Sequence, residues 1–382
     1  MPTTRQTSPL PRVLQMLIGR NGGGAESFFV KLALALQQAG LPQRLIVSSS
    51  NDRADLLRAG GCDTVQLKFG GLTDPIARFR LRRQLADFRP DVVLLWLNRA
   101  ARRCPQGDFV TAARLGGYYK LKHYRKCDHL IGNTPDIVRY LVESDWPAER
   151  TCMLSDFGDL ERLPPLDRAE LDTPPDIPLL LSLGRLHPSK GFDVMLRTLA
   201  STPGVYYWLA GVGEMRADLE ALARELGVAD RVRMPGFRND PSALYGAADL
   251  FVLPSRHEPL GNVILEAWTH GLPVVSTAAE GPSWLIDDEE NGLLVPSENP
   301  AALAAAINRL LADTALRKRI ATGGREKHDR NFSRETIAQQ YIEFFRRIAK
   351  PIGGEGVRGP SSVLFPEVRS DPTDRVQTTK TA

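Results

Sequence analysis

The sequence predicts an α/β protein of two domains, each a doubly wound parallel sheet covered by helices on both faces. Short runs rich in Val, Ile and Leu alternate with helical periodicity along most of the 382 residues. The runs are apolar almost throughout, which is typical of parallel strands buried on both faces. The pattern restarts after a proline-rich break, and the chain is longer than the roughly 250 to 300 residues that one core accommodates. We therefore expect two cores.

The first half contains five strand-like runs separated by helical segments. We expect strands at 12–19, 44–50, 64–69, 91–98 and 129–134, and helices at 25–39 and 75–89. This half, residues 1–165, is predicted to be one domain. The break at 161–178 reads ERLPPLDRAELDTPPDIP, and its prolines restrict the backbone to extended conformations, as in a linker.

The second half, residues 166–332, is predicted to be the second domain. We expect strands at 178–185, 205–211, 231–237, 250–255, 273–277 and 292–297, and helices at 215–226 and 301–311. Residues 333–350 predict a helix, with Ser333 as its N-cap, that closes the fold. Residues 351–382 are rich in Gly, Pro, Ser and Thr without a period, so we expect a disordered tail.

Composition and charge exclude several classes of protein. Apolar residues make up 42% and charged residues 25%, as in ordinary globular proteins. The net charge of +4 is small and no nucleic-acid-binding motif is present, so we expect no nucleic-acid partner. No apolar run is long enough to span a membrane, and the N-terminus lacks a signal-peptide pattern. The scattered cysteines indicate neither a disulfide framework nor a zinc site, so a reducing, cytoplasmic compartment is expected; they are Cys62, Cys104, Cys127 and Cys152.

The stretch HEPLGNVILEAWTHGLPVVS, 257–276, combines two carboxylates with a predicted helix start. The backbone N–H groups of Gly261, Asn262 and Val263 would meet an anion there. Glu266 lies one turn further on and would repel that anion, so it is better explained as an acceptor for neutral hydroxyls such as a ribose diol. Glu258 could accept from a second polyol. The ordinary alternative is a loop charge and an early-helix carboxylate that the helix dipole favours.

The segment SLGRLHPSKGFDVML, 182–196, places Arg185 and Lys190 in a loop between a strand and a helix. Both residue types suit a diphosphate, Arg as a planar fork and Lys as a point charge. The ordinary alternative is a solvated basic loop, and His187 is interpreted as a loop residue. A diphosphate flanked by two polyols describes a nucleotide-sugar.

The spacing Arg185-x4-Lys190, followed by Glu258-x7-Glu266 with GNVILEA, resembles the donor-site signatures of the retaining sugar-nucleotide glycosyltransferases of family four. The resemblance covers about residues 12–349. It implies the GT-B fold, two Rossmann-like domains facing each other across a cleft, with an N-terminal acceptor domain and a C-terminal donor domain. EPLGNVILEAW and RLGGYYKLKHYRKCDHLIGNTPDI are also similar to bacterial transferases that build the lipopolysaccharide core.

Carried over by position, the family pattern implies a catalytic set and a larger donor-binding set. Arg185 and Lys190 would hold the leaving diphosphate, and Glu258 would contact the donor sugar. The glycine-rich loop GRNGGGAESFF, 19–29, would face the phosphates, and RMPGF, 233–237, would cradle the base. The implied donor-binding residues are Gly23, Gly24, Arg185, Lys190, Gly236, Phe237, Glu258, Gly261, Asn262, Val263 and Glu266.

The acceptor side departs from the family pattern. Many members place a histidine after a middle strand of the first domain, where this sequence reads ARLGG. The acceptor-side candidates are Arg114, Tyr118, Lys122 and His123. Basic residues crowd 78–126 among tyrosines, which predicts an anionic lipid-linked saccharide as acceptor and peripheral association with a membrane surface. A solvated helix face is the ordinary alternative.

The resemblance implies transfer with retention of configuration from a UDP- or GDP-sugar, with the leaving phosphate as proton acceptor. No D-x-D triplet is present, so we expect no metal and no cofactor. A nucleotide-sugar epimerase of the same fold and a non-catalytic glycan-binding protein remain alternatives. A dehydrogenase is disfavoured because G-x-G-x-x-G is missing. The sequence does not indicate which sugar is transferred or which base the donor nucleotide carries.

Overall fold

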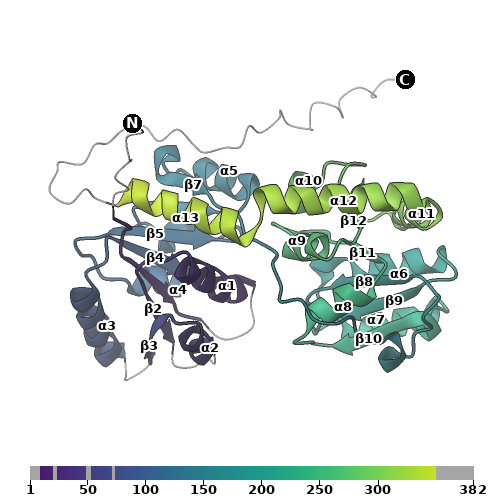
Figure 1. Ribbon diagram of the computed structural model, residues 1–382, viewed down its shortest axis with the longest axis horizontal. Helices are drawn as coiled ribbons and strands as arrows, with labels where there is room; N and C mark the ends of the chain where they lie inside the picture. The colour runs from purple at the N-terminus through teal and green to yellow at the C-terminus, as the bar shows by residue number, and fades with distance from the viewer. Residues whose placement is uncertain (1–8, 20–23, 49–52, 71–73, 350–382) are drawn as a thin grey trace, which may run out of the picture.

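The computed structural model describes residues 9–19, 24–48, 53–70 and 74–349. Figure 1 shows two halves side by side, each built around its own sheet, which confirms the predicted fold class. Within the described residues, the N-terminal sheet has seven parallel strands in the order β3-β2-β1-β4-β5-β6-β7. They are β1 (Val13–Leu17), β2 (Gln43–Ser48), β3 (Asp63–Leu67), β4 (Val92–Trp96), β5 (Val110–Leu115), β6 (His129–Gly132) and β7 (Thr151–Met153).

The C-terminal sheet has six parallel strands in the described range, in the order β10-β9-β8-β11-β12-β13. Both sheets therefore start in the middle, grow to one edge, return and grow to the other, which is the doubly wound arrangement. The strands are β8 (Leu179–Leu183), β9 (Tyr206–Ala210), β10 (Val232–Gly236), β11 (Leu250–Leu253), β12 (Val274–Thr277) and β13 (Leu293–Val295).

Helices cover both faces of each sheet. In the N-terminal half the described helices are α1 (Gly24–Gln38), α2 (Arg53–Ala59), α3 (Asp74–Phe88), α4 (Leu97–Arg103) and α5 (Pro135–Glu143). The C-terminal half has α6 (Phe192–Ala200), α7 (Arg216–Glu225), α8 (Pro241–Ala247), α9 (Asn262–Thr269), α10 (Glu280–Leu285), α11 (Pro300–Ala312) and α12 (Thr314–Asn331). The chain then returns to the first half as α13 (Arg334–Ile348).

The strand sequences follow from burial on both faces. In β1, Val13 and Leu17 face the core shared with α1 and α13, whereas Leu14 and Met16 face the core shared with α3, α4 and α5. Successive side chains of a strand point to opposite faces, so a strand between two layers of helices must be apolar at nearly every position. This explains why the central strands could be predicted from short apolar runs.

The last helix belongs to the N-terminal half although it is last in sequence. Figure 1 shows α12 lying over the C-terminal half and α13 over the N-terminal sheet. Tyr341 and Phe345 of α13 are buried in one core with Phe28 and Phe29 of α1. Ser333 caps α13 by accepting a hydrogen bond from the N–H of Thr336, as the sequence indicated.

The segment 161–178 differs from the expected linker because it packs on the C-terminal half. The N–H of Leu166 donates to the carbonyl of Ala243 at 3.0 Å, and the indole of Trp208 donates to the Thr173 hydroxyl at 2.8 Å. Its prolines therefore shape a surface layer of this half. The predicted tail, 351–382, lies outside the described residues.

Candidate active site

The loops after β8 and β11 emerge side by side at the carboxyl edge of the C-terminal sheet. These strands are neighbours, yet α6 packs on one face of the sheet and α9 on the other. Ligands of doubly wound sheets bind in the crevice that opens where successive helices depart to opposite faces. The two sequence patterns chosen as a donor site, 182–196 and 257–276, follow these two strands.

A glycine locks the two loops together. Gly191 has a φ of +63°, and a Cβ at this position would lie 2.0 Å from the carbonyl oxygen of Pro254. The N–H groups of Arg256 and His257 both donate to the carbonyl of Ser189, at 2.8 and 3.1 Å. Only glycine combines this backbone conformation with so close an approach. The loop that carries Lys190 is therefore fixed to the loop that carries Glu258.

Lys190 and Glu258 form an ion pair, with Nζ 2.5 Å from Oε2. Glu258 is 8% exposed, and the Ser255 hydroxyl donates to the same oxygen at 3.4 Å. The Glu258 N–H donates to the Glu280 carboxylate at 3.1 Å. Burial alone would raise the pKa of Glu280, but hydrogen bonds from backbone N–H groups lower it below its usual value. The contacts leave Oε1 of Glu258 to accept from a hydroxyl.

The N-terminus of α9 faces the same crevice. Gly261 precedes the helix with a φ of +91°, and no described side chain caps the first turn. The first-turn amides of Asn262 and Val263 thus have no intrahelical acceptor and suit an anion. The structure brings Lys190, Glu258 and this helix end together, as the sequence patterns required.

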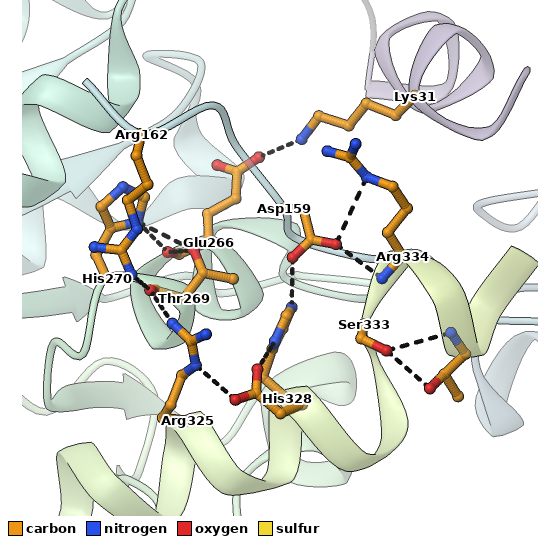
Figure 2. Close-up of polar contacts among 12 residues, drawn as sticks. Lys31, Asp159, Arg162, Glu266, Thr269, His270, Arg325, His328, Ser333 and Arg334 are labelled. Carbon is orange, nitrogen blue, oxygen red and sulfur yellow. Dashed lines mark hydrogen bonds and ion pairs between the residues drawn. The ribbon is translucent and has the colours of Figure 1, made fainter. Parts of the chain in front are cut away.

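Glu266 lies one turn into α9, where two donors hold its carboxylate. Lys31 of α1 approaches Oε1 at 3.1 Å (Figure 2). The Tyr245 hydroxyl donates to Oε2 at 3.1 Å. The pKa of Tyr245 is raised well above its usual value, first by burial and then by the Glu266 charge. Each oxygen of Glu266 keeps a further lone pair for a hydroxyl. Sequence analysis missed Lys31 and Tyr245, because both come from helices remote in sequence and no local pattern marks them.

Glycines end three adjacent strands near the predicted base site. A Cβ on Gly211 would lie 1.8 Å from the carbonyl oxygen of Gly184, and the Gly211 N–H donates to the Gly236 carbonyl at 2.8 Å. Gly236 has a φ of +80°, and the Phe237 side chain that follows is 71% exposed. This edge therefore has little side-chain bulk and one exposed ring, an arrangement on which a planar base can stack.

Two arginines beside the crevice differ in how they are used. Arg256 pairs with both oxygens of Asp193, each at 2.7 Å, and with Glu298. The hydrogen bonds that Arg256 donates to the Asp193 carboxylate are the main reason that the pKa of Arg256 is raised. Arg185 is exposed and has no hydrogen-bond or ion-pair partner in the described part of the chain. Arg185 is therefore the guanidinium that remains for a ligand.

The acceptor-side candidates lie in the loop between β5 and β6. Tyr118 is 45% exposed, hydrogen-bonds Asp136 and contacts Tyr140 edge to face. Lys122 and His123 belong to a short 3-10 helix, Leu121–His123, in which Lys122 is exposed and His123 half-buried. Gly24 is the exposed first residue of α1. Gly23 lies outside the described residues.

Arg114 departs from the expectation of direct acceptor contact. It is 3% exposed, and its guanidinium pairs with Asp156, which is 2% exposed. Burial acts to lower the pKa of Arg114, but the charge and hydrogen bond of Asp156, together with Tyr341, outweigh it and the pKa is raised. A buried guanidinium with a dedicated carboxylate acts within the protein, which corrects the sequence-based role of Arg114.

Asp159 ties together the two places where the chain passes between the halves. Its Oδ2 accepts from the N–H of Arg334 at 2.8 Å, and its Oδ1 lies 3.5 Å from Nε2 of the buried His328 (Figure 2). Gly158 lets the first crossing lie directly on α9, because a Cβ there would be 2.4 Å from the Leu265 carbonyl carbon. The segments that connect the two halves thus lie close to α9, the helix that carries Glu266.

Among the described residues, no group of three or more His, Cys, Asp or Glu side chains has the geometry to hold a metal ion. None of the described helices combines the length and the apolar composition that crossing a bilayer requires.

Comparison with known proteins defines the class. Residues 165–327 match the family model described as glycosyl transferases group 1. The chain is 39% identical over 325 residues to the lipopolysaccharide core biosynthesis glycosyltransferase LpsE of Rhizobium meliloti, covering 84% of this chain and 95% of that protein. It is 36% identical to LpsD of the same organism, another lipopolysaccharide core biosynthesis glycosyltransferase, over 85% of this chain and 95% of the relative.

The fold comparison agrees. The Anabaena protein HepE, solved in complex with UDP-glucose, superposes with a TM-score of 0.76 at 23% identity, covering 88% of this chain and 99% of that one. The chain belongs to the group 1 glycosyl transferases, and its fold is GT-B. It is a glycosyltransferase, as the sequence resemblance implied. The roles of individual site residues stay predictions.

Proposed function

We propose that this enzyme transfers a glycosyl residue from a nucleoside-diphosphate sugar to a hydroxyl of a lipopolysaccharide-core or related cell-surface acceptor, with retention of anomeric configuration. One observation carries the donor assignment: at the switch point of the C-terminal sheet, two interlocked loops bring Lys190 and Glu258 to the uncapped N-terminus of α9. Relatives named for lipopolysaccharide core biosynthesis, matched over 95% of their length, support the acceptor class.

Different groups of the site suit different parts of a nucleotide-sugar. Arg185, Lys190 and the α9 amides supply positive groups for the diphosphate. Glu266 accepts from the ribose hydroxyls, and Glu258 accepts from those of the donor sugar. The ion pair with Lys190 offsets the negative charge that Glu258 would otherwise place beside the phosphates.

In the reaction, the bond between the anomeric carbon and the phosphate oxygen breaks, and the acceptor oxygen bonds to that carbon on the same face. The acceptor hydroxyl gives its proton to the departing phosphate oxygen. Charge gathers on the leaving diphosphate in an oxocarbenium-like transition state, and fixed positive groups lower its energy. Arg185, Lys190 and α9 provide those groups, and we propose that no metal and no cofactor is needed. Activity abolished by EDTA and restored by Mn²⁺ would contradict this part.

The acceptor half carries a face suited to an anionic lipid-linked saccharide. On α3, Ile76 and Phe79 are 56% and 70% exposed, and Arg80 and Arg83 follow on the same stripe. Arg103, the last residue of α4, pairs with Asp74, the first residue of α3, at 3.3 Å. Exposed apolar side chains among arginines fit the interface of an anionic membrane. We propose peripheral association with the cytoplasmic face of the cell membrane.

The donor assignment is tested by thermal shift with UDP, GDP, ADP and their sugars. A ligand that binds the native state raises the midpoint, so one nucleotide should stabilise the wild type selectively. The shift should be lost in Arg185→Ala and kept in Arg317→Ala on α12, a half-buried arginine away from the crevice. No shift with any nucleotide would sink the proposal. Sugar converted in the absence of acceptor would indicate an epimerase instead.

The membrane assignment is tested by vesicle sedimentation. Wild type should pellet with vesicles rich in phosphatidylglycerol and stay in solution with phosphatidylcholine alone. Reversing the exposed Arg80 and Arg83 to Glu should abolish pelleting, whereas reversing Lys318 and Arg319 on α12, which are also exposed but lie in the other half, should not. Equal loss from both double variants, or no preference for anionic lipid, would refute this surface.

A further inference from the structure

A buried ion pair lies at the end of the acceptor half that meets α9. Arg114 in β5 pairs with Asp156, which follows β7, and both are nearly inaccessible. The guanidinium lies over the rings of Phe28 and Trp96, at 4.8 and 5.1 Å. Two charges removed from water give little net stability, so such a pair calls for a purpose other than holding the fold together.

Asp156 divides its carboxylate between the two halves of the molecule. One oxygen, Oδ1, takes the bond from Arg114. The other, Oδ2, accepts from the side-chain amide of Asn262 at 3.0 Å, across 106 residues of sequence. Asn262 is the first residue of α9, the helix whose N-terminus faces the donor site. The acceptor half is thus bonded to the start of the donor-binding helix.

Unpaired polar atoms gather around this link. In the described part of the chain, Arg114 Nε, Asn133 Oδ1, Ser155 Oγ and Asn262 Oδ1 are buried without a hydrogen-bond partner. Arg114 and Asn133 adjoin each other, since a Cβ on Gly116 would lie 3.4 Å from Nη1 of the first and 3.6 Å from Nδ2 of the second. Buried unpaired groups are rare in folded proteins and concentrate where function, not stability, selects the residues.

We propose that Arg114 and Asp156 are positioning residues, which hold Asn262, and with it the N-terminus of α9, at a fixed place relative to the acceptor half. This inference rests on the proposed function. The donor sugar is placed by α9 and the acceptor by the other half, so the link sets the distance between the two reacting atoms. Its loss lowers turnover while the nucleotide, which does not contact Arg114 or Asp156 in the proposed donor site, binds as before.

The test replaces the ion pair by apolar side chains, Arg114→Met with Asp156→Leu. Apolar replacement of a buried ion pair is often neutral for stability, so this variant keeps the fold and removes the link. We expect kcat to fall on the order of 10- to 100-fold, the range that misplacement of about 1 Å produces. The Kd for UDP or GDP, measured by calorimetry with whichever binds wild type, should be unchanged.

Asn262→Ala removes the link from the donor side and covers the case in which the double variant does not fold. Combined with the double variant, it should add no further loss of kcat, because both break one connection. Asn299→Ala, which removes an asparagine at the start of another helix in the same half, is the matched control and should keep wild-type kcat.

The inference is overturned by wild-type kcat in a folded double variant, by losses that add independently, or by a nucleotide Kd that weakens in step with kcat. These results differ from failure of the proposed function, in which the wild type itself would bind no nucleoside diphosphate and transfer no sugar.

Discussion

The two halves share a strand order, yet they present different chemistry at the carboxyl edges that face each other. In the C-terminal half, glycines, a lysine and two carboxylates converge in loops locked by Gly191. In the N-terminal half, the corresponding edge buries its arginine against Asp156 and exposes tyrosines and lysines in the following loop. The family model likewise matches only 165–327.

The difference follows from what each half must bind. A diphosphate imposes the same demands on any protein, namely positive groups, backbone amides and close backbone approach, so the donor half uses a recurring set of residues. Acceptors share no chemical group that makes comparable demands on the protein. The sequence of the acceptor half is therefore less informative.

The largest effect we expect concerns the core that joins α13 to the N-terminal half. Phe345→Ala removes a fully buried ring and should cost about 3–5 kcal/mol. Urea unfolding should show an early transition of the N-terminal half alone. Phe79→Ala, at a 70% exposed ring of α3, should change stability by no more than about 0.5 kcal/mol. Simultaneous loss of both halves would show that they do not unfold as separate cores.

Lys190→Ala, in the donor half, should lower kcat far more than a comparable substitution in the acceptor half. It removes a positive group from the leaving diphosphate and leaves Glu258 without its cation, so kcat should fall about 100- to 1000-fold. Steady-state kinetics with saturating donor measures this. Lys122→Ala, in the exposed loop of the acceptor half, should raise the acceptor KM and leave saturated turnover unchanged. Similar kinetics from the two variants would erase the distinction.

Glu266→Gln should weaken the donor and leave the acceptor unaffected. The neutral amide is a poorer acceptor for ribose hydroxyls, and hydrogen bonds to charged groups are worth about 1.5–3 kcal/mol, so the donor KM should rise about 10- to 100-fold. Glu335→Gln, an exposed glutamate in the first turn of α13, serves as the control. An unchanged donor KM would remove Glu266 from the site.

Lys31→Met tests the contact that the acceptor half makes with the donor helix. The pair with Glu266 is partly exposed, at 27% and 16%, so it is worth about 1 kcal/mol or less and the donor KM should rise only about two- to fivefold. The salt dependence of that KM should weaken as well. Lys31→Arg keeps the charge and should retain the wild-type salt dependence, and failure to do so would count against an electrostatic role.

The smallest effect we expect is a pH dependence of the free energy of unfolding, caused by one histidine in each half. Burial is the main cause that lowers the pKa of His129, which contacts Phe344, and of His270, at the end of α9. A lowered folded pKa means that the unfolded chain takes up the proton first, so stability falls as pH drops below about 6.5. His129→Gln and His270→Gln should each flatten the urea midpoint between pH 7.5 and 5.5.

Much of the fold was predictable because the central strands are apolar on both faces. β5 was missed because its residues, VTAARL, include Thr, Ala and Arg, and only its register between β4 and β6 buries them. The segment 161–178 was interpreted as a linker because prolines exclude regular structure, although they do not exclude packing on a surface.

At the candidate site, the residues that could be predicted from the sequence are those in motifs whose members lie close together along the chain. Lys190 and Glu258 follow two strands directly, and strand ends of a parallel sheet meet at one edge. Lys31, Tyr245 and Asp156 enter only through helix packing and through the crossing between the halves, which no local pattern encodes. Arg114 was named as an acceptor-side candidate from its place near ARLGG, whereas the carboxylate that pairs with it lies 42 residues further on and no local pattern marks the pair.

Because α13 completes the first core, the order of synthesis and the order of folding disagree. The ribosome delivers β1 to β7 long before Tyr341 and Phe345, so the apolar surface of α1 that they cover stays open while the entire donor half is made. The donor half has its own sheet and cores and can fold in the meantime. The acceptor half, although first off the ribosome, is therefore the last to complete its core.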